Sequence, residues 1–217
     1  MINVVGWQSF AFFIVLLTII CGAFAYLAET PSSLIDFFSL FSKVGFVLSI
    51  IVVGIGQSPI FALLCNFWPL NLLFPNIDGE WHGKITSNWP AIAKAQGITD
   101  PDGNPFKEST IPVQVDICVK LLTISIELRS NSGYQNSKTV SCVLKRNSHR
   151  GFELSYIYRS TVPGPRVSDD QSFVGAGLID ISSKNPTQLN GLYWTNRKWV
   201  EGLNTAGEIV LSREDTE

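Results

Sequence analysis

Residues 77–89 read IDGEWHGKITSNW and mark the point at which the character of the chain changes. Apolar residues before this stretch come in long uncharged runs, whereas from Ile77 onward they alternate with polar residues at a spacing of two. Side chains of an extended strand alternate between its two faces. One face then carries Trp81, Gly83, Ile85, Ser87 and Trp89, and the other carries Glu80, His82, Lys84, Thr86 and Asn88. The stretch predicts the first strand of a β domain that spans residues 76–217.

Residues 1–75 predict two transmembrane helices. Residues 1–28 contain no charged side chain, and residues 44–77 contain none either. About 20 consecutive apolar residues suffice to cross a bilayer as a helix. We expect the two helices at about residues 5–27 and 44–68, where together they form a hairpin. Since two crossings return the chain to the side on which it started, both chain ends should lie on the same side of the membrane.

The second predicted helix carries polar residues near its middle, where a simple anchor would carry leucine or valine. Pro59 has no backbone N–H and kinks a helix, and the polar side chains of Gln57 and Ser58 are costly at bilayer depth. Gly54 and Ser58 also have the four-residue spacing of small residues that allows close helix packing. Two interpretations are open. This segment packs tightly against the first helix, or it forms an oligomer contact at which the bilayer is opened.

Turn-forming residues separate a series of alternating runs in the β domain. After the first strand and a long loop at 91–109, we expect strands at 111–120, 121–129, 134–146, 151–160, 171–181, 188–197 and 202–213. Short alternating strands without intervening helices are typical of a sandwich or of an up-and-down barrel. A barrel of eight strands has an interior just wide enough for one small ligand.

The charge balance of the β domain argues against a nucleic acid partner. The 217-residue chain has 16 Lys and Arg residues and 18 Asp and Glu residues, and only Lys43, Glu29 and Asp36 of these lie before residue 76. The β domain is therefore close to neutral and lacks the broad basic surface by which proteins bind DNA or RNA. The four cysteines form no CxxC pair, which argues against a zinc site and favours free thiols in a reducing, cytoplasmic compartment.

Motifs of catalysis are absent from the sequence. It contains no GxSxG, HExxH, Walker or GxGxxG pattern. The pair Gly175 and Gly177 falls within a predicted strand, where glycine eases barrel curvature more often than it cradles phosphate. We therefore expect no enzymatic activity, no metal and no cofactor.

The informative residues of the β domain combine aromatic rings with polar groups. Tyr156 and Tyr158 share one face of a predicted strand, and Tyr193, Thr195 and Arg197 share one face of another. Nucleobases stack on aromatic rings, while hydroxyl groups and arginine suit ribose and phosphate. Aromatic residues also fill barrel cores routinely. A ligand pocket and a packed core are therefore equally consistent with these residues.

Four short motifs, together with the membrane hairpin, carry a resemblance to a known family. They are Gly79-x-Trp81-x-Gly83, Ile111-x-Val113-Gln114, Leu154-x-Tyr156-x-Tyr158 and Gly191-x-Tyr193-x-Thr195-x-Arg197. In this order they resemble the two-transmembrane β-barrel effectors that are associated with CD-NTases in CBASS antiphage defence. The Gly79-x-Trp81 pair is also similar to the start of lipocalin-type barrels, in which the tryptophan plugs one end of the barrel.

The resemblance implies an eight-stranded, lipocalin-like antiparallel β-barrel that binds a cyclic dinucleotide made by a partner CD-NTase. Binding is implied to drive homo-oligomerisation, after which the helices disrupt the bacterial inner membrane and the infected cell dies. The barrel and both chain ends would be cytoplasmic. The expected ligand-binding residues are Lys84, Ser87, Trp89, Gln114, Tyr156, Tyr158, Tyr193, Thr195 and Arg197, and the expected membrane-active residues are Gly54, Gln57, Ser58 and Pro59. Arg197, Lys84 and backbone amides would neutralise the two phosphates.

Two other functions are consistent with a barrel on a membrane hairpin. One is a membrane-anchored, lipocalin-like carrier of an apolar ligand, and the other is a membrane adaptor whose filled barrel binds no ligand. The composition of the interior separates these functions, because a carrier of lipids needs an apolar lumen. Ser87, Gln114, Thr195 and Arg197 are expected to face inward, which favours the nucleotide receptor.

Overall fold

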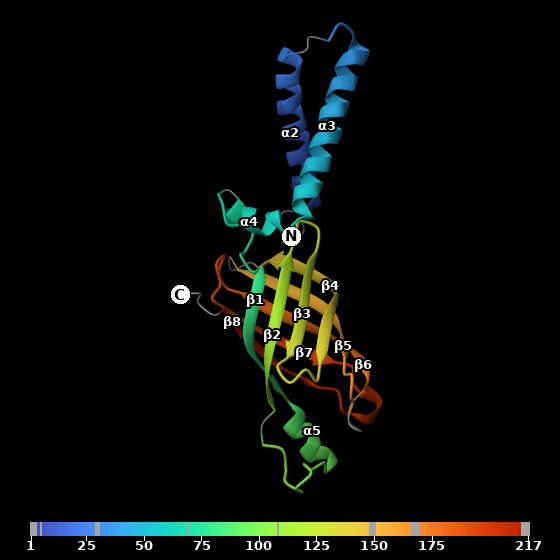
Figure 1. Ribbon diagram of the computed structural model, residues 1–217, viewed down its shortest axis with the longest axis vertical. Helices are drawn as coiled ribbons and strands as arrows, with labels where there is room; N and C mark the ends of the chain where they lie inside the picture. The colour runs from blue at the N-terminus through green and yellow to red at the C-terminus, as the bar shows by residue number, and fades with distance from the viewer. Residues whose placement is uncertain are drawn as a thin grey trace.

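The structure, a computed structural model, consists of a two-helix hairpin followed by a closed eight-stranded antiparallel β-barrel, which confirms the predicted fold class. It describes residues 4, 6–28, 31–68, 70–107, 109–147, 151–165 and 170–213. The hairpin projects from one end of the barrel, and a short helix, α5 (Trp89–Gln96), lies at the opposite end (Figure 1).

Two long apolar helices form the hairpin, α2 (Trp7–Ala28) and α3 (Leu34–Gly56). Both are long and apolar enough to cross a membrane. The start predicted for the first helix, residue 5, lies outside the described residues. Gly22 and Gly45 allow the two helices to approach closely, because each lies against a side chain of the other helix.

The second membrane helix differs at both ends from the prediction of 44–68. It begins directly after Ser33, whose side chain accepts a hydrogen bond from the Asp36 backbone amide at 3.1 Å and so caps the helix. It ends at Gly56, because Pro59 has no N–H with which to continue the helical hydrogen bonds.

Gln57, Ser58 and Pro59 therefore lie just beyond the end of α3, and the expectation that they sit near its middle is wrong. The backbone amide and the hydroxyl of Ser58 both donate to the Ile55 carbonyl, at 3.1 and 2.7 Å, and close the last turn. Gly54 remains inside α3, where an added side chain would meet no atom within 4 Å. Of the four predicted membrane-active residues, only Gly54 belongs to a helix that is long and apolar enough to cross a membrane.

A short connector holds the hairpin against the barrel. It contains α4 (Ile60–Leu64) and the 3-10 helix η1 (Leu70–Leu72). The Leu121 backbone amide, in the turn between the second and third strands, donates a hydrogen bond to the Gly56 carbonyl at 2.7 Å. Phe61 of α4 is buried in the same hydrophobic cluster as the barrel interior. The hairpin is thus in direct contact with the barrel.

Eight strands form the barrel, and the last pairs with the first to close it. They are β1 (Gly79–Ser87), β2 (Thr110–Val119), β3 (Ile124–Ser130), β4 (Asn136–Arg146), β5 (Phe152–Thr161), β6 (Ser172–Ile181), β7 (Gln188–Thr195) and β8 (Ala206–Ser212). Every other pair joins strands that are consecutive in sequence. This up-and-down order agrees with the alternating runs of the sequence and resolves the choice between a sandwich and a barrel in favour of the barrel.

Trp81 plugs the end of the barrel that faces the hairpin. Its side chain is fully buried, and its indole Nε1 donates a hydrogen bond to the Ile77 carbonyl at 3.0 Å. The Arg213 guanidinium lies 4.6 Å from the centre of the Trp81 ring and donates to the Asp78 carbonyl at 2.6 Å. The Arg213 cation over the ring face and the hydrogen bond of the indole N–H hold Trp81 in place, and the ring closes this end of the barrel.

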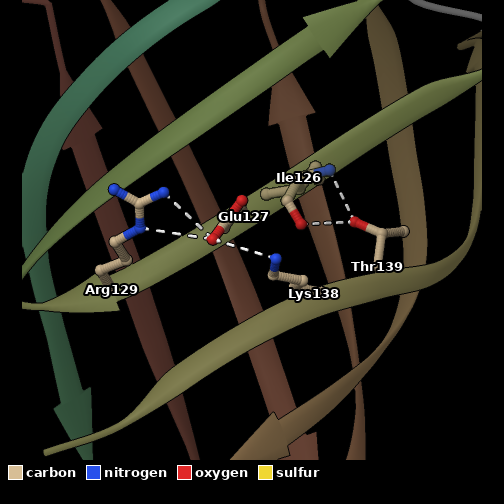
Figure 2. Close-up of polar contacts among 5 residues, drawn as sticks. All are labelled: Ile126, Glu127, Arg129, Lys138 and Thr139. Atoms are coloured by element: carbon tan, nitrogen blue, oxygen red, sulfur yellow. Dashed lines mark hydrogen bonds and ion pairs between the residues drawn. The ribbon is translucent and has the colours of Figure 1, made fainter.

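The seam between β3 and β4 is held in part by a side chain. Only three residues of β3, Glu127–Arg129, pair with β4. On the other side of β4, its pairing with β5 shifts register between Thr139 and Ser141. The Thr139 hydroxyl donates to the Ile126 carbonyl at 2.7 Å and accepts from the Ile126 amide at 2.6 Å (Figure 2). On the outer face, Glu127 binds Arg129 and Lys138 at 3.1 and 3.5 Å. These ion pairs are solvent-exposed and contribute little to stability.

The segment after β1 differs from the long loop predicted at 91–109, because it begins with α5. Pro90 occupies the first turn of this helix, where a missing N–H has no cost. Gly97 ends it with a φ of +66°, a conformation that glycine adopts readily. The rest of the segment leads back to β2 beside the barrel mouth.

Candidate functional site

A cavity of about 770 Å³ occupies the interior of the barrel. Its lining extends from inward residues of β1, such as Ile85, to Pro163 and Gly164 in the loop after β5. Volumes of 300–1,000 Å³ are typical of pockets for small molecules. The barrel is therefore closed at the hairpin end, open at the other end and hollow between them.

The cavity wall is apolar in its depth, and at its mouth it carries polar groups beside aromatic rings. The apolar residues are Val113, Val115, Ile126, Leu128, Ile179, Ile209 and Leu211. The polar residues near the mouth include Ser87, Ser109, Thr110, Ser130, Ser132 and Gln135. Among the described residues that line the cavity, Arg197 is the only one with a charged side chain. The mouth suits a ligand that has polar groups and a small number of negative charges.

Two tyrosines form an aromatic wall on β5. The ring centres of Tyr156 and Tyr158 are 5.7 Å apart, and their planes are inclined by 33°. Tyr156 lies opposite Gly177 on β6, and Tyr158 lies opposite Gly175. A side chain at either glycine would overlap the facing tyrosine ring. The glycine pair, expected to ease curvature, thus provides the space in which the two rings lie against the wall.

Burial disfavours ionisation of the tyrosine hydroxyls in the cavity. It raises the pKa of Tyr156 and of Tyr158 well above the usual value of 10.0. Burial also raises the pKa of Tyr193, against smaller opposing effects of a hydrogen bond with Ser87 and of the positive charge on Arg197. At neutral pH all three phenols are hydrogen-bond donors as well as stacking surfaces.

Arg197 lies at the mouth and stacks on Trp89, which in turn packs against Phe106. Its guanidinium carbon is 5.1 Å from the centre of the Trp89 ring, whose centre is 6.0 Å from that of Phe106. Asn196 positions this part of the chain, because its side chain accepts a hydrogen bond from the Val174 amide at 2.8 Å. Stacking on an aromatic face fixes the orientation of a guanidinium group.

Ser87 and Thr195 line the cavity as predicted, but their hydroxyl groups differ in use. The Ser87 hydroxyl accepts from the Trp89 amide at 3.2 Å and also bonds with Tyr193, so it belongs to the polar mouth. The buried Thr195 hydroxyl accepts from the Thr205 amide and lies 3.1 Å from the Thr205 hydroxyl. Thr195 therefore ties β7 to the segment that leads into β8.

Lys84 and Gln114 lie outside the cavity, which contradicts their predicted place in the pocket. Val113 and Val115 point inward, so the side chain of Gln114 between them must point outward. There its amide donates a hydrogen bond to the Glu80 carboxylate at 2.5 Å. Lys84 is exposed on the same outer face of β1 as Glu80. Since side chains alternate between the two faces of a strand, both Lys84 and Gln114 are excluded from the interior once the inward residues are known.

The contacts of Trp89 with Phe106 and Arg197 were only partly predicted from the sequence. Trp89 was expected in the site, but as a continuation of the strand rather than as the first residue of α5. Phe106, which packs against it and lines the cavity, was placed in a featureless loop. The signal for α5 was present, since Asn88 precedes the helix and a proline follows within its first turn.

Comparison with known proteins places these features in a family. The family model described as "Cap15, cyclic dinucleotide receptor domain" matches residues 72–213, which run from the last residue of η1 through the whole barrel. A relative named "CD-NTase-associated protein 15", from Escherichia albertii, is 28% identical over 140 residues. That match covers 64% of this chain and 63% of the relative, so it spans less than two thirds of the relative's length. Since the model covers more than half of the sequence, the chain belongs to the Cap15 cyclic dinucleotide receptor family.

Proposed function

We propose that this protein is a membrane-anchored receptor that binds one cyclic dinucleotide inside its barrel and acts as an effector of CBASS antiphage defence. The observation that carries the proposal is the cavity itself. A hollow of about 770 Å³ presents stacked tyrosines, phenol donors and Arg197 in a barrel of a receptor family. A filled barrel, as the adaptor function requires, would have no such space.

In the proposed binding mode, the bases bind in the depth of the cavity and the phosphates bind at its mouth. The bases enter between the tyrosines of β5 and Tyr193 and stack on their rings, because base–aromatic stacking is strong for every base. Arg197 donates charge-assisted hydrogen bonds to a phosphate at the mouth. The second phosphate is bound by the hydroxyl groups and backbone amides of the rim, because Lys84 lies on the outer face. A part of the ligand then remains in contact with water.

The proposed response to the ligand takes place in the membrane. The helices α2 and α3 span the bacterial inner membrane, with the barrel and both chain ends in the cytoplasm, where a partner CD-NTase makes the ligand. Ligand-bound barrels assemble into a homo-oligomer and bring many hairpins together, which raises the effective concentration of weakly associating helices. The open side of α3 at Gly54 supports a helix–helix contact between copies. The crowded helices disrupt the bilayer and the infected cell dies.

A panel of ligands tests the proposal on the full chain in detergent micelles. Thermal unfolding is followed with cyclic dinucleotides of different bases and linkages, with linear dinucleotides and with a long-chain fatty acid. A ligand at about 100 times its Kd stabilises the folded state by roughly 2.7 kcal/mol. We expect a cyclic dinucleotide to raise the Tm and the linear ones to have a much smaller effect. A shift with the fatty acid alone would favour the apolar carrier, and no shift with any compound would favour the adaptor.

A further inference from the structure

The connector between α3 and the barrel has two unlike faces. On one face, Phe61, Cys65 and Phe74 are buried against the closed end of the barrel, and the two phenylalanine ring centres are 5.7 Å apart. On the other face, large apolar side chains are exposed to solvent. They are Ile60, Leu63, Phe67, Trp68 and Leu73, with Phe67 67% and Trp68 79% exposed. An apolar surface of this kind on a polar barrel requires a partner.

The position of the connector indicates what covers this surface. It follows within a few residues of Gly56, at which the second membrane-spanning helix ends. The hydrogen bond from Leu121 to Gly56 keeps the closed end of the barrel at the same level. Trp7, at the start of α2, lies at this end of the hairpin and is also largely exposed. The connector therefore lies between the hairpin and the closed end of the barrel (Figure 1). A hairpin that spans a bilayer would leave it at this height.

The composition of the connector fits the headgroup region of a membrane. Residues 44–77 contain no charged side chain, so the exposed face meets no electrostatic penalty at a lipid surface. Tryptophan prefers the membrane–water boundary, where its ring is buried and its N–H remains near water. Apolar side chains that are exposed at a lipid surface are stabilised when they are buried at the boundary of headgroups and acyl chains.

We propose that residues 57–68 and 70–73 form an interfacial anchor that binds the lipid surface and seats the closed end of the barrel on the membrane. The side chains of Leu63, Phe67 and Trp68 enter the headgroup region of the leaflet that faces the barrel. The cavity mouth, at the opposite end, then faces away from the membrane, so a ligand enters from the aqueous phase. This inference extends the proposed function, because it rests on the membrane anchoring of the hairpin.

Fluorescence quenching by brominated lipids tests the anchor on the full chain. The protein is reconstituted into vesicles of phosphatidylethanolamine and phosphatidylglycerol whose acyl chains are brominated near the headgroup. Trp68→Phe is compared with Trp199→Phe, because Trp199 is similarly exposed, at 69%, but lies on η2 (Trp199–Glu201) at the mouth. We expect the quenched fraction of the emission to fall in Trp68→Phe, because this variant loses a tryptophan that is in contact with lipid. The fraction should rise in Trp199→Phe, because this variant loses a tryptophan that the lipid does not quench.

An unchanged or larger quenched fraction in Trp68→Phe would overturn the anchor. Repeating the measurement at one chain per vesicle separates lipid from a second copy of the chain as the occupant. Quenching of Trp68 that persists on dilution supports the lipid contact, whereas quenching that disappears on dilution contradicts it. Cyclic dinucleotide binding is measured on the same vesicles, so a failure of the receptor function would be seen separately from a failure of the anchor.

Discussion

Tyr158 on β5 lies directly opposite Gly175 on β6, and its ring occupies the space that any side chain at residue 175 would need. Tyr156 and Gly177 repeat the arrangement two residues along each strand. The aromatic wall of the cavity is therefore specified by two strands together. The tyrosines provide the rings, and the glycines allow those rings to lie flat against the barrel wall.

The first prediction concerns the space beneath the rings. A methyl group at Gly177→Ala would lie 2.5 Å from the Tyr156 ring, so the ring must move into the cavity. Overpacking of this kind costs about 1–3 kcal/mol, and we expect a lower Tm together with weaker ligand binding. The matched control is Gly164→Ala at the mouth, where an added methyl meets no atom within 4 Å. Equal thermal unfolding of the two variants would contradict the role assigned to the glycine.

The second prediction concerns the floor of the cavity. Trp81→Ala should destabilise the barrel by about 3–5 kcal/mol, because it removes a fully buried ring and leaves a void. Trp81→Phe keeps most of the volume and loses the hydrogen bond to Ile77, so its cost should be clearly smaller. Urea unfolding of the full chain in micelles measures both variants. A similar cost for both variants would mean that the indole hydrogen bond, rather than the filled volume, closes this end.

The third prediction concerns the seam between β3 and β4. Thr139→Val keeps the shape of the side chain but leaves the amide and the carbonyl of Ile126 without the hydroxyl that bonds both. An unsatisfied buried polar group costs about 1–3 kcal/mol, so we expect a loss of stability in this range. Thr139→Ser keeps the hydroxyl and should cost less. Amide hydrogen exchange at Ile126 provides a local readout, and unchanged protection in Thr139→Val would refute the assignment.

The fourth prediction concerns stability at alkaline pH. In the unfolded chain the cavity tyrosines ionise near pH 10, whereas burial raises the pKa of Tyr156 and Tyr158 in the folded barrel. Above pH 10 the unfolded state therefore loses protons that the folded state retains, and the free energy of unfolding falls as the pH rises. Each such group contributes up to about 1.4 kcal/mol per pH unit.

Urea unfolding from pH 8 to pH 11, with tyrosinate absorbance as a second signal, measures this effect. Tyr158→Phe removes one of the titrating groups, so its stability should fall less steeply with pH than that of the parent protein. If the two proteins had the same pH dependence above pH 10, Tyr158 would not be a buried, protonated phenol in the folded barrel.

The side of the strand on which each residue lies was predictable from the sequence wherever alternation was regular. The spacing of Trp81, Ile85 and Ser87 placed all three inside the barrel, and the same rule placed the tyrosines of β5. The prediction that Gln114 faces inward was wrong, because it rested on the chemistry of the side chain. The neighbouring residues Val113 and Val115 are apolar and occupy the inward positions. Lys84 failed for the same reason.

Two other features depend on information that local patterns do not contain. The uncharged run 44–77 includes both the end of α3 and the connector, so hydropathy alone cannot separate them. The pairing of Tyr158 with Gly175 depends on the register between two strands, which is set by the closed barrel as a whole. The helix α5 is different, because Asn88 before it, Pro90 in its first turn and Gly97 after it are local signals that predict a helix.

The most direct test of the central claim, that the ligand lies inside the barrel, is the cyclic dinucleotide affinity of Arg197→Ala compared with that of Arg159→Ala. Arg197 lines the cavity mouth, whereas Arg159 is exposed on the outer face of β5 and serves as the matched control. Isothermal titration of both variants and the parent, after their thermal unfolding has been shown to agree, measures the difference. Loss of a charge-assisted bond to phosphate should weaken binding by about 1.5–3 kcal/mol, or roughly 10- to 150-fold, in Arg197→Ala alone. Parent-like affinity in a folded Arg197→Ala, or a greater loss in Arg159→Ala, would contradict a site inside the barrel.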